Sequence, residues 1–160
     1  METSNSLSEK LGKRLQQRKH VMATAESCTG GGIAASITDV AGSSAWFERA
    51  FITYSNEAKQ EMVGVKSATL EQYGAVSEPV VQEMVTGALE YSNATIAVSV
   101  SGIAGPSGGS LEKPVGTVCF GWRDLTGWER IETCHFEGSR AQVREQALLY
   151  ALQTIYDYLE

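Results

Sequence analysis

Hydrophobic residues recur at helical spacing in some segments of this chain and at strand spacing in others. Leu7, Leu11 and Leu15 are four residues apart, which predicts an opening amphipathic helix. The closing segment has the clearest helical signal, because Ser139 and Gln142 form a capping box ahead of an apolar stripe. Between these two segments we expect further helices at about 30–40, 56–62, 68–73 and 77–91.

Short apolar runs between the predicted helices have the length and flanks of buried strands. They lie at 21–25, 50–54 and 94–100. Two further strands, at 115–123 and 128–136, are expected to form a hairpin through the glycine-containing loop 124–127. Strands that alternate with helices and end in a hairpin predict an α/β fold, with a mixed sheet and helices on its faces.

The segment Thr24–Gly32 joins the first predicted strand to the next helix and carries the strongest functional signal. It reads Thr-Ala-Glu-Ser-Cys-Thr-Gly-Gly-Gly, which places hydroxyls, a thiol and glycines at one junction. Free N–H groups at the start of a helix favour negative charge, and Gly30 and Gly31 let a ligand approach the backbone. Ser27 is therefore a candidate active-site residue. Taken alone, a hydroxyl such as Ser27 or Thr29 more commonly caps a helix.

A second polar cluster follows this segment. Ser44 lies in Ala41-Gly-Ser-Ser, where capping a turn is the simpler interpretation. Lys59 comes four residues after Ser55, a predicted helix cap, and from there its side chain would point back toward the strand ends. On a solvated helical face the same lysine would be ordinary.

The strand at 94–100 leads into a glycine-rich loop that contains Ser101, Gly102 and Gly105. Loops at the carboxyl ends of strands often hold phosphates in α/β folds, although no standard nucleotide-binding motif is present here. Arg140 and Arg144 lie one helical turn apart and would suit a phosphate, while a solvated arginine pair is the simpler interpretation of that spacing.

Composition indicates one globular domain, 1–160, and excludes several functions. The chain has 160 residues, of which 42% are hydrophobic and 20% charged, enough for a substantial core. Its formal net charge of -6 argues against binding to nucleic acid, which needs many lysines and arginines. No apolar run is long enough to cross a membrane, and the polar amino terminus has no signal-like core, so we expect a cytoplasmic protein.

The cysteines and histidines limit the chemistry further. Three cysteines without a CxxC pair indicate neither a disulfide framework nor a thiolate zinc site. His20 and His135 are the only histidines, which excludes a metal site of the HExxH type. His20 precedes the strand whose far end carries Ser27, a separation of roughly 20 Å at about 3.3 Å per residue. Lys59 is the obvious remaining base.

A lysine base must be neutral near pH 7, which requires burial or a nearby cation. Tyr54 would orient Lys59 or donate a proton, and backbone N–H groups from Cys28 to Gly30 would hold an oxyanion. Cys28 is a rival nucleophile, although a buried inert thiol is its more ordinary state.

Long motifs follow one another along nearly the whole chain. They are Thr24-Ala-Glu-Ser-Cys-Thr-Gly-Gly, Ala41-Gly-Ser-Ser, Tyr54-Ser-Asn-Glu-Ala-Lys59, Gly74-Ala-Val-Ser-Glu78, Ser101-Gly-Ile-Ala-Gly-Pro106 and Lys113-Pro-Val-Gly-Thr117. Together they resemble the C-terminal domain family of the competence/damage-inducible protein CinA. The chain is most similar to the stand-alone members, which act as nicotinamide mononucleotide (NMN) amidohydrolases.

The resemblance implies a three-layer α/β/α sandwich, a homodimer, and deamidation of NMN to nicotinate mononucleotide and ammonia in pyridine nucleotide salvage. It implies a serine–lysine mechanism without cofactor or metal, in which Ser27 matches the nucleophile, Lys59 the base and Tyr54 a third catalytic residue. The residues expected around the substrate are Cys28, Thr29, Gly30, Gly31, Ser44, Ser101, Gly102, Gly105 and Arg140. Ser107 stands where many relatives have an acidic residue.

A second class of function stays open at this point. A nucleotide-binding or regulatory module without turnover would have the same glycine-rich loops, since binding and catalysis use them alike. Ammonia release from NMN distinguishes the two functions.

Overall fold

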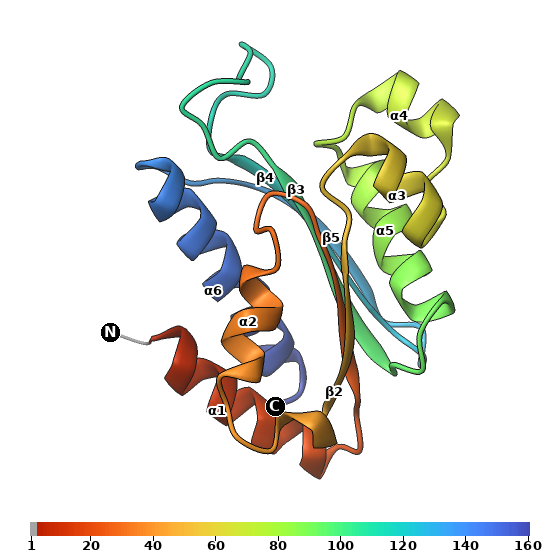
Figure 1. Cartoon of the computed structure of the whole chain (residues 1–160), viewed down its shortest axis with the longest axis vertical. Coiled ribbons are helices and arrows are strands. Elements are labelled where there is room, and N and C mark those ends of the chain that lie inside the picture. Colours follow the sequence, from red (N-terminus) through yellow and green to blue (C-terminus); the bar gives the residue numbers. More distant parts are fainter. Residues whose placement is uncertain (1–2) are drawn as a thin grey trace.

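A five-stranded mixed sheet runs through the middle of the molecule, and helices cover both of its faces (Figure 1). This computed structural model describes residues 3–160. The strands, in the order in which they lie side by side, are β2 (Phe47–Ile52), β1 (Met22–Glu26), β3 (Ile96–Gly102), β4 (Thr117–Asp124) and β5 (Glu129–His135). Neighbours among the first three are parallel, and β4 and β5 pair antiparallel to complete the sheet. The predicted three-layer α/β/α sandwich is confirmed.

One face of the sheet is covered by α1 (Ser4–Gln17), α2 (Gly32–Thr38) and α6 (Arg140–Tyr158). The predicted opening stripe is confirmed, because Leu7, Leu11 and Leu15 are buried in the core between these helices and the sheet. The capping box of Ser139 and Gln142 at the start of α6 is also present. This layer therefore follows the hydrophobic pattern closely.

The opposite face is covered by α3 (Asn56–Val63), α4 (Ser67–Tyr73) and α5 (Glu78–Glu90). A second core lies here, centred on α5 and including Val80, Val81, Met84 and Val85, all fully buried. β1 lies between the two cores, and all of its residues are therefore buried. The end of β1 is thus held from both sides.

The second strand begins earlier than its apolar run suggested. We expected it at 50–54, but β2 spans Phe47–Ile52. The first half of β2 contains Glu48 and Arg49, which interrupt the apolar pattern used to predict strands. Such polar side chains are tolerated because β2 is an edge strand. Since the strand ends at Ile52, Thr53 and Tyr54 lie beyond it, at the edge of the sheet where the parallel strands end.

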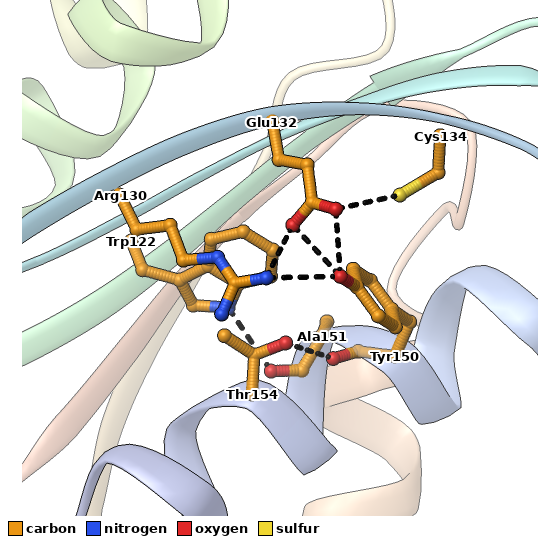
Figure 2. Close-up of polar contacts among 7 residues, drawn as sticks. All are labelled: Trp122, Arg130, Glu132, Cys134, Tyr150, Ala151 and Thr154. Carbon is orange, nitrogen blue, oxygen red and sulfur yellow. Dashed lines mark hydrogen bonds and ion pairs between the residues drawn. The ribbon is translucent and has the colours of Figure 1, made fainter.

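The other edge strand is fastened to α6 by side-chain contacts (Figure 2). Both carboxylate oxygens of Glu132 on β5 accept hydrogen bonds from the Tyr150 hydroxyl on α6, at 2.7 and 2.8 Å. Burial, together with this bond, raises the pKa of Tyr150 to about 12, so the phenol stays a donor. Trp122, on the neighbouring strand β4, donates to the Ala151 carbonyl of α6 at 3.1 Å. These bonds fix α6 on the sheet and thereby position its first turns.

Candidate active site

The turn after β1 places Ser27 at the carboxyl end of the strand. Its N–H donates to the Val100 carbonyl on β3 at 3.0 Å, and its own carbonyl accepts from the Gly30 N–H at 3.0 Å. Gly30 and Gly31 have φ values of 57° and 96°, a left-handed backbone in which a side chain would be strained. The glycines therefore form the tight turn that leaves the Ser27 side chain beside α3.

Lys59 reaches the same point from the first turn of α3. The helix begins as predicted at Ser55, whose hydroxyl accepts from the Ala58 N–H at 3.0 Å. The Lys59 side chain is 1% exposed, and its Nζ lies 3.0 Å from Ser27 Oγ. Nζ also contacts the carbonyl oxygens of Thr53 at 3.0 Å and Tyr54 at 3.2 Å. The structure thus brings the predicted nucleophile and base into direct contact.

The surroundings of Lys59 favour its neutral form. Among the described residues it forms no ion pair with a carboxylate, and burial lowers its pKa. A neutral amine has two N–H donors and one lone pair. In the structure Nζ donates to the Thr53 and Tyr54 carbonyls and to Ser27 Oγ, and in the neutral form the two carbonyls can accept both of its protons while its lone pair takes the Ser27 proton. The arrangement can deprotonate Ser27.

Cys28 lies next to Ser27 but has the properties of an inert thiol. Its side chain is buried, and burial raises its pKa to about 12. A thiol must ionise to act as a nucleophile, so this environment suppresses its reactivity. The geometry favours Ser27 over Cys28.

Tyr54 contributes to the site mainly through its backbone. Its carbonyl contacts Lys59, while its side chain is 61% exposed and its hydroxyl accepts from Arg140 at 3.3 Å. The guanidinium of Arg140 also donates to the Gly105 carbonyl at 2.8 Å. Tyr54 and Arg140 therefore form one side of the pocket mouth, and the hydrogen bond of the phenol goes to Arg140, whereas Lys59 is bound by the Tyr54 carbonyl.

Arg144 and Thr29 support the turn from inside. Arg144 donates to the carbonyls of Cys28 and Thr29, each at 3.1 Å. The Thr29 hydroxyl donates to Glu26 at 2.7 Å, so it is turned away from the pocket. Glu26, which sequence analysis passed over, also accepts the N–H groups of Ile33 and Ala34 at 3.0 Å. The start of α2, expected to attract a ligand, is thus occupied by the protein's own carboxylate.

Ser101 and Gly102, expected in a loop, are the last residues of β3, and together with Ala104 just beyond the strand they line the pocket. The pocket, of about 250 Å³, is lined by Ser27, Cys28, Tyr54, Asn56, Lys59, Ala75, Val76, Ser101, Gly102, Ala104 and Arg140. Gly102 also allows close packing, because a Cβ there would lie 2.8 Å from Val118 Cγ2. Sequence analysis did not assign Asn56, Ala75 or Val76 a place in the pocket, whereas Ala104 belongs to the segment 101–109 that the family resemblance puts around it. The first three residues could have been predicted from the sequence, because they lie in the same motifs as other residues that line the pocket.

Several residues considered from the sequence do not line this pocket. Thr29, Gly30, Gly31 and Gly105 lie close in sequence to lining residues but are absent from the lining itself. Ser44 and His20 lie farther away. Ser44 is exposed in a short 3-10 turn just before β2. His20 lies just before β1, where its Nδ1 contacts Thr95 Oγ1 at 2.8 Å. Both are at the edge where the parallel strands begin, whereas Ser27 is at the edge where they end. The structure does not bring Ser44 to Ser27, and it agrees with the exclusion of His20 as the base.

Comparison with known families matches residues 4–159 to the CinA C-terminal domain. The chain belongs to the CinA C-terminal domain family. The chain is similar to the nicotinamide-nucleotide amidohydrolase PncC of Escherichia coli (strain K12), to which it is 59% identical over 150 residues, with 94% of this chain and 91% of that protein covered. PncC of Pseudomonas putida is 49% identical over 154 residues, with 95% and 94% covered.

Solved structures of CinA-type proteins have the same fold. The competence/damage inducible protein CihA from Agrobacterium tumefaciens superposes with a TM-score of 0.95 at 39% identity, covering 98% of this chain and 96% of that one. The competence damage-inducible protein A (ComA) from Klebsiella pneumoniae gives a TM-score of 0.95 at 37% identity, with 99% and 98% covered. The chain thus shares its overall fold with both of these solved structures.

Two negative findings concern residues 3–160 of this CinA C-terminal domain. None of the helices in that range is long and apolar enough to span a bilayer. The same range contains no group of three or more histidine, cysteine, aspartate or glutamate side chains arranged to hold a metal ion.

Proposed function

We propose that this chain hydrolyses the carboxamide of NMN to nicotinate mononucleotide and ammonia, with Ser27 as the nucleophile and Lys59 as the general base. The name of its 59% identical relative, a nicotinamide-nucleotide amidohydrolase, supports the reaction. The observation that carries the mechanism is the 3.0 Å contact between buried Lys59 Nζ and Ser27 Oγ.

The reaction proceeds in two halves. Neutral Lys59 takes the hydroxyl proton of Ser27, and the alkoxide attacks the carboxamide carbon to form a tetrahedral intermediate. The protonated lysine then gives its proton to the departing nitrogen, which leaves as ammonia. In the second half, Lys59 takes a proton from water, hydroxide attacks the ester, and Ser27 regains its proton as nicotinate mononucleotide is released. Every proton passes through Lys59, so no step needs a metal or cofactor.

The oxyanion of the intermediate is held by backbone N–H groups at the start of the turn, those of Cys28 and Thr29. The Gly30 N–H was also expected to bind the oxyanion, but it already donates to the Ser27 carbonyl and is therefore not part of this proposal. Donors fixed by a tight turn stabilise developing charge without reorganising during the reaction.

Substrate binding follows from the charges around the pocket. We expect the nicotinamide ring to bind in the pocket of about 250 Å³, between Ala75 and Val76 on one side and Ser101, Gly102 and Ala104 on the other, with the ribose phosphate at the mouth. Arg140 is at that mouth, and its planar fork suits phosphate oxygens. The ring of NMN is cationic and helps to keep Lys59 neutral, because like charges disfavour each other.

The remaining parts of the proposal concern the protein as a whole. One domain, 1–160, acts as a homodimer in the cytoplasm within pyridine nucleotide salvage. The net charge of -6 disfavours binding to a nucleic acid polymer. The ligand in this proposal is the small nucleotide NMN. Light scattering with size-exclusion chromatography tests the dimer, and a monomer at working concentration would overturn it.

Ammonia release tests the function directly. The purified protein is incubated with NMN in the presence of EDTA, and ammonia and nicotinate mononucleotide are measured together. Equal amounts of both products support the proposal. Saturable binding of NMN without ammonia would instead favour the nucleotide-binding or regulatory module.

A further inference from the structure

Glu26 is fully buried and directly precedes the proposed nucleophile. Its Oε1 accepts from the Thr29 hydroxyl at 2.7 Å and the Ile33 N–H at 3.0 Å. Its Oε2 accepts from the Thr24 hydroxyl and the Ala34 N–H, both at 3.0 Å. One carboxylate thus binds β1, the turn and the first turn of α2 together.

This carboxylate has no cationic partner in the described part of the chain, where it forms no ion pair with a lysine or arginine. A buried charge is unfavourable unless hydrogen bonds satisfy it, and four donors do so here. All four come from the segment 24–34, which also contains Ser27. The carboxylate therefore acts as an internal anion around which the turn is folded.

We propose that Glu26 is the positioning residue for the nucleophile: its carboxylate fixes the turn 27–31 so that Ser27 Oγ stays against Lys59 Nζ. This role rests on the proposed function. Glu26 itself does not line the pocket, so it acts through Ser27 and touches no substrate.

A carboxylate is required at this position because of the kind of donors it meets. An amide of the same shape has one accepting oxygen and one donating nitrogen. Whichever way it is turned, its nitrogen faces a hydroxyl and a backbone N–H, either those of Thr29 and Ile33 or those of Thr24 and Ala34. The hydroxyl can rotate to accept, but the backbone N–H cannot. Glu26→Gln therefore loosens one side of the turn while keeping the side-chain volume.

The test compares Glu26→Gln with a control in another buried carboxylate. Asp124 is 2% exposed and holds a turn by accepting from the Thr126 N–H at 2.9 Å and the Trp128 N–H at 3.2 Å. It pairs with Ile96 at the start of β3, the edge of the sheet away from Ser27. Asp124→Asn therefore makes the same chemical change in a turn that has no contact with the site.

We expect Glu26→Gln to lower kcat for NMN about 100-fold and to change KM by less than about threefold, because misplacement of a reacting atom by about 1 Å has an effect of this size. Asp124→Asn keeps kcat within about twofold, even where its melting temperature falls. Both are assayed well below their melting temperatures. A folded Glu26→Gln protein with normal kcat, or equal losses of kcat in the two variants, overturns the proposal.

Two further measurements make the result decisive. Thr29→Val removes one of the four donors to Glu26 without changing the side-chain volume, and we expect kcat to fall about tenfold. This variant also serves if Glu26→Gln does not fold. In that case an unchanged kcat in Thr29→Val overturns the positioning role of Glu26. The rate at which diisopropyl fluorophosphate modifies Ser27, followed by mass spectrometry, reports the same geometry without NMN. If the wild type reacts at Ser27 but releases no ammonia, the proposed function fails, and the slower modification expected of Glu26→Gln still tests the positioning role.

Discussion

Replacing Lys59 with methionine removes the proposed base but keeps an unbranched side chain in a buried position. The change has two effects on stability that differ in their dependence on pH. Loss of the contacts to Ser27 and to the carbonyls of Thr53 and Tyr54 is a fixed effect. Loss of the ionisable group has an effect on stability that changes with pH. This effect can therefore be measured separately from the fixed one.

The sign of the pH effect follows from the lowered pKa of Lys59. Burial lowers this pKa in the folded protein, while a lysine in the unfolded chain titrates at about 10.4. Between these two values the unfolded chain binds a proton that the folded protein does not, so wild-type stability rises with pH. We expect the free energy of unfolding of wild type, minus that of Lys59→Met, to increase by about 1.4 kcal/mol per pH unit across this window. Below the folded pKa the difference is constant.

Urea unfolding of both proteins between pH 6 and about pH 10.5 measures this difference, with the m-values compared to check that the denatured states match. The activity profile supplies the second half of the assay. For wild type, kcat/KM should rise with pH along a limb at the folded pKa of Lys59, and Lys59→Arg, which keeps the charge, should lose about a thousandfold. Stability curves that stay parallel throughout, or a folded arginine variant with near-normal turnover, would refute a neutral Lys59.

Three further predictions concern residues around Lys59. Ser27→Ala should abolish ammonia release while leaving the Kd for NMN within about threefold, and Cys28→Ala should keep most activity; the reverse pattern would make Cys28 the nucleophile. Arg140→Ala should raise KM for NMN at least tenfold more than KM for nicotinamide riboside, which has no phosphate, and equal effects would exclude a phosphate contact. Arg144→Ala should lower kcat for both substrates alike, because Arg144 binds the carbonyls of the turn; an effect on KM for NMN alone would contradict this.

Local patterns predicted most of the fold. Apolar repeats identified α1 and α6, and the capping box located the first residue of α6. The errors lie where tertiary position overrides local composition. The first half of β2 has polar residues because it is at the sheet edge, and α2 begins at Gly32, later than expected, because Gly30 and Gly31 are in the left-handed turn.

The sequence also indicated the pair Ser27 and Lys59, because a strand end and a helix start limit where their side chains can point. It could not assign the supporting residues. Arg140 and Arg144 have the same type and spacing, yet Arg140 is at the pocket mouth and Arg144 supports the turn. Glu26 was overlooked because a carboxylate inside an apolar strand has no local signature; its four donors become visible only once the turn has folded around it.

The contact between Arg144 and the Cys28 carbonyl joins residues 116 positions apart in the chain. During synthesis at about 5–20 residues per second, roughly 6–23 s pass between the addition of Cys28 and that of Arg144. Throughout this interval the nucleophile turn lacks its last support, and contacts of such long range form late in folding. A truncated chain that ends before α6 therefore keeps the four Glu26 bonds of the turn but lacks the two bonds from Arg144, and we expect it to release ammonia more slowly than the full chain.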